Sequence, residues 1–283
     1  MKNIFSIDLE SWIHFYEDSL KIQKYRSAER KTLDRGYIVK VTSELLKMLS
    51  ANKQKATFFI VAEIYDWYPE IIREIQKNGH EIAYHTHTHP LIKNKEILER
   101  ELSLSKKFIA DFKPRGFRAP QIFLPENAFI TLEKKGFAYS SSSYDEFIIT
   151  NHGKVFEIPV SVVSLRKSVF SPLLPKPLTF KLLTTKFPIG SGLSIALFGA
   201  RTSSFIHTLN KQGTPAILFI HPWQVYQTRE ITSFSYKLKL LLNNPLCFPY
   251  TINIKNALEK LFKAHTFTSF HTYFYEQQGI LGQ

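Results

Sequence analysis

Two histidines four residues apart are the clearest candidates for chemistry in this sequence. They enclose the run His85-Thr-His-Thr-His89. On a helical turn, residues at i and i+4 share one face, so the two imidazoles could hold one divalent metal ion while His87 points away. Histidines also gather near helix caps without any function. A third ligand is therefore needed before a metal site is favoured.

Two acids near the start of the chain are candidate partners for these histidines. Asp8 and Glu10 close the run 3–8, which is rich in β-branched and aromatic residues and predicts a strand. Being two apart, the acids point to the same side, at a strand end where α/β proteins often carry active sites. Two histidines and one carboxylate would form a three-ligand zinc site and leave the other carboxylate as a base. The alternative is that one acid only caps the next segment.

Two further residues complete the candidate site. Arg118 lies in Gly116-Phe-Arg-Ala-Pro120, and His221 directly follows the most apolar predicted strand, 216–220. A single histidine in that place is more often structural. The catalytic interpretation depends on the order of the motifs along the chain.

Helical and strand patterns alternate along the chain, which predicts an α/β fold with buried parallel strands, in either a barrel or an open sheet. Strands are predicted at 3–8, 56–61, 81–84, 155–160 and 216–220. Helices are predicted at 39–49, 69–78, 94–112, 126–135, 203–211, 234–242 and 254–264. We expect one domain over 1–283, with 165–200 an insertion or long loop and 227–283 a C-terminal helical part.

Composition limits the classes of function. The 283 residues carry 37 basic and 24 acidic side chains, a net charge of +13. Residues 165–283 hold 13 basic and 3 acidic side chains, so +10 of this excess lies there. A basic half attracts nucleic acid, anionic lipid or a phosphorylated substrate equally well, and it also serves simply as a solvated surface. Nucleic acid is the least favoured partner because no recognised motif accompanies the charge.

Cysteine content and apolar runs predict the compartment of the protein. Cys247 is the single cysteine, so an intramolecular disulfide is excluded. The apolar run before Asp8 is too short for a secretory signal, and no stretch approaches the length of a membrane helix. We expect a cytoplasmic protein, with peripheral contact to the inner membrane face as an option. The oligomeric state is left open.

The ordered motifs resemble the polysaccharide deacetylase family, the NodB-homology carbohydrate esterases. They are Asp-x-Glu, Ala-Thr-Phe-Phe, Gly-His-Glu-Ile-Ala-x-His-x-x-x-His, Gly-Phe-Arg-Ala-Pro and a strand ending in His-Pro-Trp. The resemblance runs from residue 4 to about residue 226, and the later helices are similar to a subgroup found beside exopolysaccharide export systems. It implies a distorted (β/α)7 barrel that holds a divalent metal, usually Zn²⁺, at the carboxyl ends of its strands.

The same resemblance implies a role for each candidate residue. The base is Asp8, the arginine that holds it is Arg118, and the general acid is His221. The metal ligands are Glu10, His85 and His89. Substrate contacts fall on Pro120, Gln121 and Trp223, the last of which also reads as a buried aromatic residue.

Three positions depart from the family pattern. Many relatives place two adjacent aspartates where this chain has Asp8-Leu-Glu10, so Asp8 itself is an alternative ligand. Ser140 replaces an aspartate that often orients the histidine acid. Gln224 replaces a glutamate.

The missing aspartate has a chemical consequence. Without a carboxylate partner, His221 would have a lower pKa and a weaker orientation, unless Asp145 or Glu157 takes that part.

Together these features predict a metal-dependent N-deacetylase. Its partner would be an N-acetylated amino sugar of a surface polysaccharide or of the lipid-linked precursor. The alternatives are an amidohydrolase acting on a small non-sugar amide and a catalytically weak carbohydrate-binding protein of the same fold.

Overall fold

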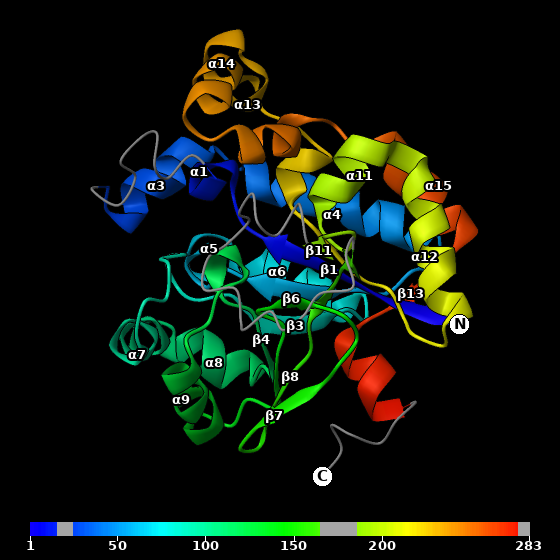
Figure 1. Ribbon diagram of the computed structural model, residues 1–283. Coiled ribbons are helices and arrows are strands. Elements are labelled where there is room, and N and C mark those ends of the chain that lie inside the picture. Colours follow the sequence, from blue (N-terminus) through cyan, green and yellow to red (C-terminus); the bar gives the residue numbers. More distant parts are fainter. Residues whose placement is uncertain (16–24, 165–185, 277–283) are drawn as a thin grey trace.

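A curled, mostly parallel sheet forms the centre of the computed structural model, which describes residues 1–15, 25–164 and 186–276 (Figure 1). The strand order is β12-β1-β2-β3-β4-β5-β8-β7, and β13 also pairs with β1. All neighbours in this sheet run parallel except β7 and β8. Its strands are β1 (Lys2–Leu9), β2 (Thr57–Ile60), β3 (Glu81–Tyr84), β4 (Gly116–Phe117), β5 (Tyr139–Ser140), β7 (Thr150–His152), β8 (Val155–Glu157), β12 (Ile217–Ile220) and β13 (Thr266–Thr268).

Helices lie outside the curled sheet, with α7, α8 and α9 on one side of the view and α11, α12 and α15 on the other (Figure 1). Their bounds in the first half are α1 (Trp12–Phe15), α3 (Ser27–Asp34), α4 (Tyr37–Ala51), α5 (Glu63–Trp67), α6 (Pro69–Lys77), α7 (Lys95–Leu104), α8 (Lys106–Phe112) and α9 (Phe129–Lys134). In the second half they are α11 (Gly192–Phe198), α12 (Thr202–Lys211), α13 (Arg229–Thr232), α14 (Phe234–Asn243) and α15 (Lys255–Ala264). Within the described ranges, none is long and apolar enough to cross a membrane.

Most predicted elements are confirmed, with corrections where periodicity is a weak signal. The helix predicted over 94–112 is two helices, α7 and α8, which break at Ser105. The strand predicted over 155–160 is also divided, into β8 and β9 (Val160–Ser161). Of the segment 165–200, residues 165–185 lie outside the described part of the chain, and 192–198 form helix α11. The C-terminal part contains strand β13 in addition to the expected helices.

A non-strand connection through Gly190 joins β12, at one edge of the curled sheet, to Ser161, which follows β8 in the chain. The Phe219 N–H donates to the Gly190 carbonyl at 2.7 Å, and the Gly190 N–H donates to the Ser161 carbonyl at 2.8 Å. A Cβ on residue 190 would lie 2.2 Å from the Ile217 carbonyl oxygen, so only glycine allows this close approach. Single residues, rather than a paired strand, thus link β12 to Ser161.

Alternation along β1 separates the core from the site. Phe5, Ile7 and Leu9 pack in the large apolar cluster beneath the outer helices. Ile4 faces the other way, into a smaller cluster with Phe59. Asp8 lies on the same face of β1 as Ile4. One face of this strand therefore builds the large core, and the other carries a carboxylate.

Candidate active site

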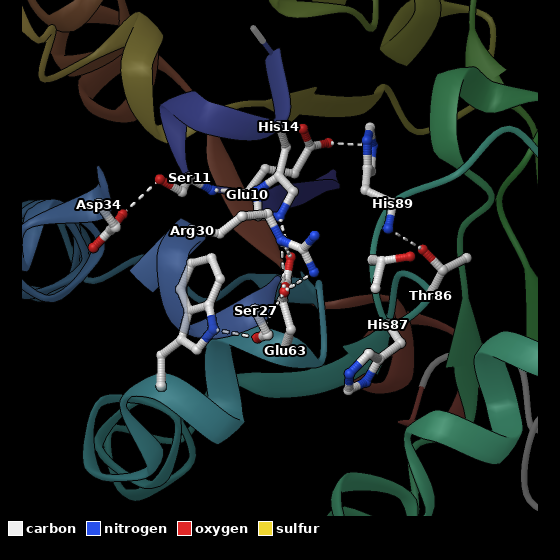
Figure 2. Close-up of polar contacts among 12 residues, drawn as sticks. Glu10, Ser11, His14, Ser27, Arg30, Asp34, Glu63, Thr86, His87 and His89 are labelled. Atoms are coloured by element: carbon white, nitrogen blue, oxygen red, sulfur yellow. Dashed lines mark hydrogen bonds and ion pairs between the residues drawn. The ribbon is translucent and has the colours of Figure 1, made fainter. Parts of the chain in front are cut away.

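The carboxylate of Glu10 is the centre of the candidate site. Its Oε1 lies 3.1 Å from the His85 Nε2, 3.0 Å from the His89 Nε2 and 3.6 Å from the His221 Nε2. Burial alone raises the pKa of Glu10, but His89, His221 and the His85 hydrogen bond outweigh it and hold this pKa well below its usual range. Figure 2 shows the Glu10 carboxylate directed at the His89 ring.

The loop that carries the two histidines is not helical, so the helical turn expected for residues 85–89 is wrong. Thr86 and His89 both have a left-handed φ of 64°. The loop is held by the Ala62 N–H, which donates to the Thr86 carbonyl at 2.9 Å. The His85 and His89 rings still converge, with centroids 5.0 Å apart. His87 does point away, toward the Ser105 hydroxyl at 3.1 Å.

The donor set fits a divalent metal ion. Ligand atoms of Glu10, His85 and His89 all lie within 4.8 Å of one another. The His85 Nδ1 is 2.7 Å from the Arg118 carbonyl, which can only accept, so neutral His85 turns an Nε2 lone pair toward the Glu10 carboxylate. Two such acceptors face each other favourably only when a proton or a cation lies between them. Two imidazoles and a carboxylate are typical ligands of zinc.

Asp8 lies beside this set and is held by Arg118. The Arg118 Nη1 is 2.7 Å from the Asp8 Oδ1, and both side chains are buried. The guanidinium also donates to the Ser141 carbonyl at 2.9 Å and lies over the Phe59 ring, 4.1 Å from its centroid. This arginine is therefore fixed from several sides, and Asp8 with it.

Asp8 also belongs to a second group of possible metal ligands. A carboxylate oxygen of Asp8 lies within 4.8 Å of ligand atoms of Glu10 and His221, which form a second group able to hold a cation. The alternative in which Asp8 itself is a ligand stays a prediction.

His221 follows β12 and begins the 3₁₀ turn η5 (Pro222–Gln224). Its N–H donates to the Gln224 Oε1 at 3.0 Å, and the same oxygen is 3.4 Å from its Nδ1. Trp223 stacks on the imidazole, with ring centroids 4.4 Å apart. Burial lowers the pKa of His221, while Glu10 and Asp8 act in the opposite direction.

The structure gives Gln224 a role that the sequence did not explain, because its side chain orients His221. The two carboxylates considered as substitutes have other partners. The Glu157 Oε1 accepts from the Ser142 N–H at 2.7 Å, and burial raises its pKa. Asp145 pairs with Lys186.

The three expected substrate contacts differ in accessibility. Pro120 is buried, whereas Gln121 is exposed and has a left-handed φ of 59° in the 3₁₀ turn η2 (Pro120–Ile122). Trp223 is 1% exposed and is stacked against Phe15 as well as His221. In this structure Trp223 is therefore a packing residue. Its contact with substrate stays a prediction, as do the contacts of Pro120 and Gln121.

A second buried polar cluster next to the site was missed by sequence reasoning (Figure 2). The Arg30 Nη2 lies 2.6 Å from the Glu63 Oε2, and the His14 Nε2 is 2.9 Å from the Glu63 Oε1. Because the Ser11 N–H donates to the His14 Nδ1, neutral His14 donates from Nε2 to Glu63.

This cluster supports the histidine loop. The His14 ring packs edge-on against His89, with centroids 5.9 Å apart, and the Glu63 N–H donates to the His87 carbonyl at 3.1 Å. Burial raises the pKa of Glu63, but His14 and Arg30 outweigh it and lower that pKa overall. No spacing rule joins residues this far apart in the chain, so only the fold reveals them.

A buried carboxylate with two histidines, at the carboxyl ends of a curled parallel sheet, is typical of metal-assisted hydrolases. Comparison with known proteins refines this class. The polysaccharide deacetylase family model matches residues 31–140. A peptidoglycan-N-acetylglucosamine deacetylase of Bacillus cereus is 30% identical over 112 residues, 35% of this chain and 41% of the relative. A chitooligosaccharide deacetylase of Bradyrhizobium is 31% identical over 120 residues, 40% of this chain and 55% of the relative.

These matches show that residues 31–140 are similar to polysaccharide deacetylases. The matched part spans about half the length of these curated relatives.

Solved structures confirm the fold. Puue allantoinase superposes with a TM-score of 0.57 at 15% identity, covering 97% of this chain and 90% of that one. A protein of Mycobacterium smegmatis described as a polysaccharide deacetylase gives a TM-score of 0.53 at 18% identity, covering 78% and 76%. The predicted α/β barrel class is therefore correct.

Proposed function

We propose that this chain is a metal-dependent hydrolase that removes the N-acetyl group from an amino sugar of a surface polysaccharide or of its lipid-linked precursor. The convergence of Glu10, His85 and His89 within 4.8 Å carries this proposal, since a metal-assisted hydrolase needs such a donor set. The two relatives are named as deacetylases of peptidoglycan N-acetylglucosamine and of chitooligosaccharide. These names support an N-acetylated saccharide as the substrate class.

A divalent ion, with Zn²⁺ as our choice, would be held by Glu10, His85 and His89 and would supply Lewis-acid activation of the acetamide carbonyl and of a water molecule. The chain's own residues supply the proton transfers. Asp8, oriented by Arg118, takes a proton from the water as its oxygen bonds to the carbonyl carbon.

His221 completes the reaction. The Gln224 Oε1 can only accept a hydrogen bond, so the His221 Nδ1 beside it carries a proton. The His221 Nε2 is then the ring nitrogen that exchanges protons with the substrate. Protonated at Nε2, this ring donates to the leaving nitrogen as the C–N bond breaks. The products are acetate and a free amino sugar.

Metal content by elemental analysis is the first test, because it needs no choice of substrate. Wild type should bind one divalent ion per chain, and His85→Ala and His89→Ala should each lose it. His87→Ala is the matched control, because it lies in the same loop but points away from Glu10. It should bind metal as wild type does.

The second test is acetate release from N-acetylglucosamine oligomers by the metal-loaded protein. Asp8→Asn should abolish release while retaining metal, as expected of a base that is not a ligand. Wild type that stays metal-free after reconstitution with zinc, cobalt or nickel would refute the hydrolase. Metal binding without acetate release would favour the small-amide substrate or the binding protein instead.

A further inference from the structure

Helix α14 carries a group of large apolar side chains that face solvent. Phe234 is 80% exposed, Leu238 44%, Leu241 47% and Leu242 74%. Single exposed apolar residues are ordinary on protein surfaces, but four on one ten-residue helix are not. In Figure 1, α13 and α14 project at the top of the molecule, away from the strands.

The four side chains form one stripe. At about 100° per residue, positions 234, 238, 241 and 242 fall within an arc of about 100°. The opposite face holds the helix on the protein: Tyr236 is buried in a cluster with Trp12 and Trp223, and Leu240 packs against the same cluster. This helix is therefore firmly attached on one face and apolar on the face that looks outward.

Positive charge surrounds the stripe. By the same geometry, Lys237 and Lys239 lie on its two sides, where long basic side chains can reach past an apolar face toward anions. Arg229, at the start of α13, is exposed as well. Residues 231–258 contain three lysines and no aspartate or glutamate. A surface of this composition complements a partner that is negative at its edge and apolar beneath.

We propose that α14 docks this protein on an anionic lipid membrane, lying in the plane of the headgroups with its apolar stripe inserted. Ten residues rise only about 15 Å, so the helix is too short to span the bilayer. Amphipathic helices with a basic border bind such interfaces through apolar burial together with attraction to anionic lipid. A second copy of the chain fits less well, because two such faces would oppose lysine to lysine.

Docking at α14 would place the candidate site close to the lipid surface. Tyr236 of the helix and Trp223 share one buried cluster, and Trp223 stacks directly on His221. The docking inference goes beyond the proposed hydrolase, since it concerns where the protein sits and not the reaction. Its test uses neither metal nor saccharide, so the two proposals fail separately.

Vesicle flotation of the full chain tests the inference. Wild type should float with phosphatidylglycerol-containing vesicles at low salt and should bind pure phosphatidylcholine at least tenfold more weakly. The double variant Phe234→Ser with Leu242→Ser should lose at least tenfold in binding to the anionic vesicles. Lys237→Gln with Lys239→Gln should weaken that binding and reduce its dependence on salt.

A matched control removes two apolar side chains elsewhere. Ile130 and Ile148 are 52% and 60% exposed and lie outside α14. The double variant Ile130→Ser with Ile148→Ser should bind as wild type does, and circular dichroism should show all variants folded.

Three results would overturn the proposal. One is wild type that does not bind anionic vesicles, or binds neutral ones equally well. Another is an α14 variant that binds as wild type does. The third is a wild-type protein that is dimeric by light scattering and that the α14 substitutions convert to a monomer without vesicle binding. A second copy of the chain would then cover the stripe.

Discussion

Replacing Arg118 with methionine should destabilise the protein by about 3–5 kcal/mol, because the change leaves a carboxylate buried without its cation. Asp8 is 2% exposed and Arg118 is fully buried, so water cannot solvate the remaining charge. The guanidinium also contacts the Ser6 hydroxyl, the Ser141 carbonyl and the Ser141 hydroxyl, each at 2.9 Å.

These contacts allow the loss to be divided. The two hydroxyls can rotate toward other acceptors, whereas the carbonyl is left unpaired at a cost of about 1 kcal/mol. Most of the remainder belongs to the unpaired Asp8 carboxylate. Adding Asp8→Asn to the Arg118→Met variant removes that charge and should restore about 2–3 kcal/mol.

The assay is urea unfolding followed by circular dichroism, on protein treated with a chelator so that bound metal does not contribute. Arg73→Met is the matched control. Its partner Glu70 is also 2.7 Å away, but the side chains are 52% and 83% exposed, so this change should cost less than about 1 kcal/mol. A cost below about 1 kcal/mol for Arg118→Met, or no recovery with Asp8→Asn, would refute the reasoning.

Two further predictions concern His80 and Gly192. Burial lowers the pKa of His80 to about 4, and the Ala56 N–H donates to its Nδ1, so the folded state holds this ring neutral. Stability conferred by that depressed pKa is complete above about pH 6.5 and falls by about 3 kcal/mol toward pH 4. His80→Asn should flatten this part of the urea-unfolding profile relative to wild type, and an unchanged profile would contradict the assignment. Gly192→Ala would place a Cβ 2.2 Å from the Gln224 Oε1. Displacing Gln224 should then reduce kcat on the order of 10- to 100-fold, with metal content retained, because His221 loses its orienting oxygen; full activity would show that Gln224 does not position the acid.

The fold class could be predicted from strand and helix patterns, because buried parallel strands and amphipathic helices leave strong periodicities in the sequence. The pairing of Asp8 and Glu10 on one side also followed from spacing alone. The approach of His85 and His89 did not follow from helical geometry. It depends on two left-handed residues whose conformation the surrounding structure imposes.

Other parts of the structure had no signal in the sequence. Gln224 stood out only as a departure, since its contact with His221 requires the turn after β12. The link through Gly190 is made by single hydrogen bonds, which leave no periodic pattern. Glu63 is buried between Arg30 and His14, which belong to distant elements, and tertiary structure alone brings them together.

The pairing of β1 has a consequence for the order in which the candidate site assembles during folding. On one side Ile4 pairs with Ile217, and on the other Lys2 pairs with Thr266, so the strand that precedes Glu10 is completed by segments from the far part of the chain. Contacts of such high sequence separation close large loops and form slowly. The first half of β1 is therefore expected to pair late in folding. The end beside Glu10 pairs with the nearer strand β2, where Leu9 lies opposite Ile60.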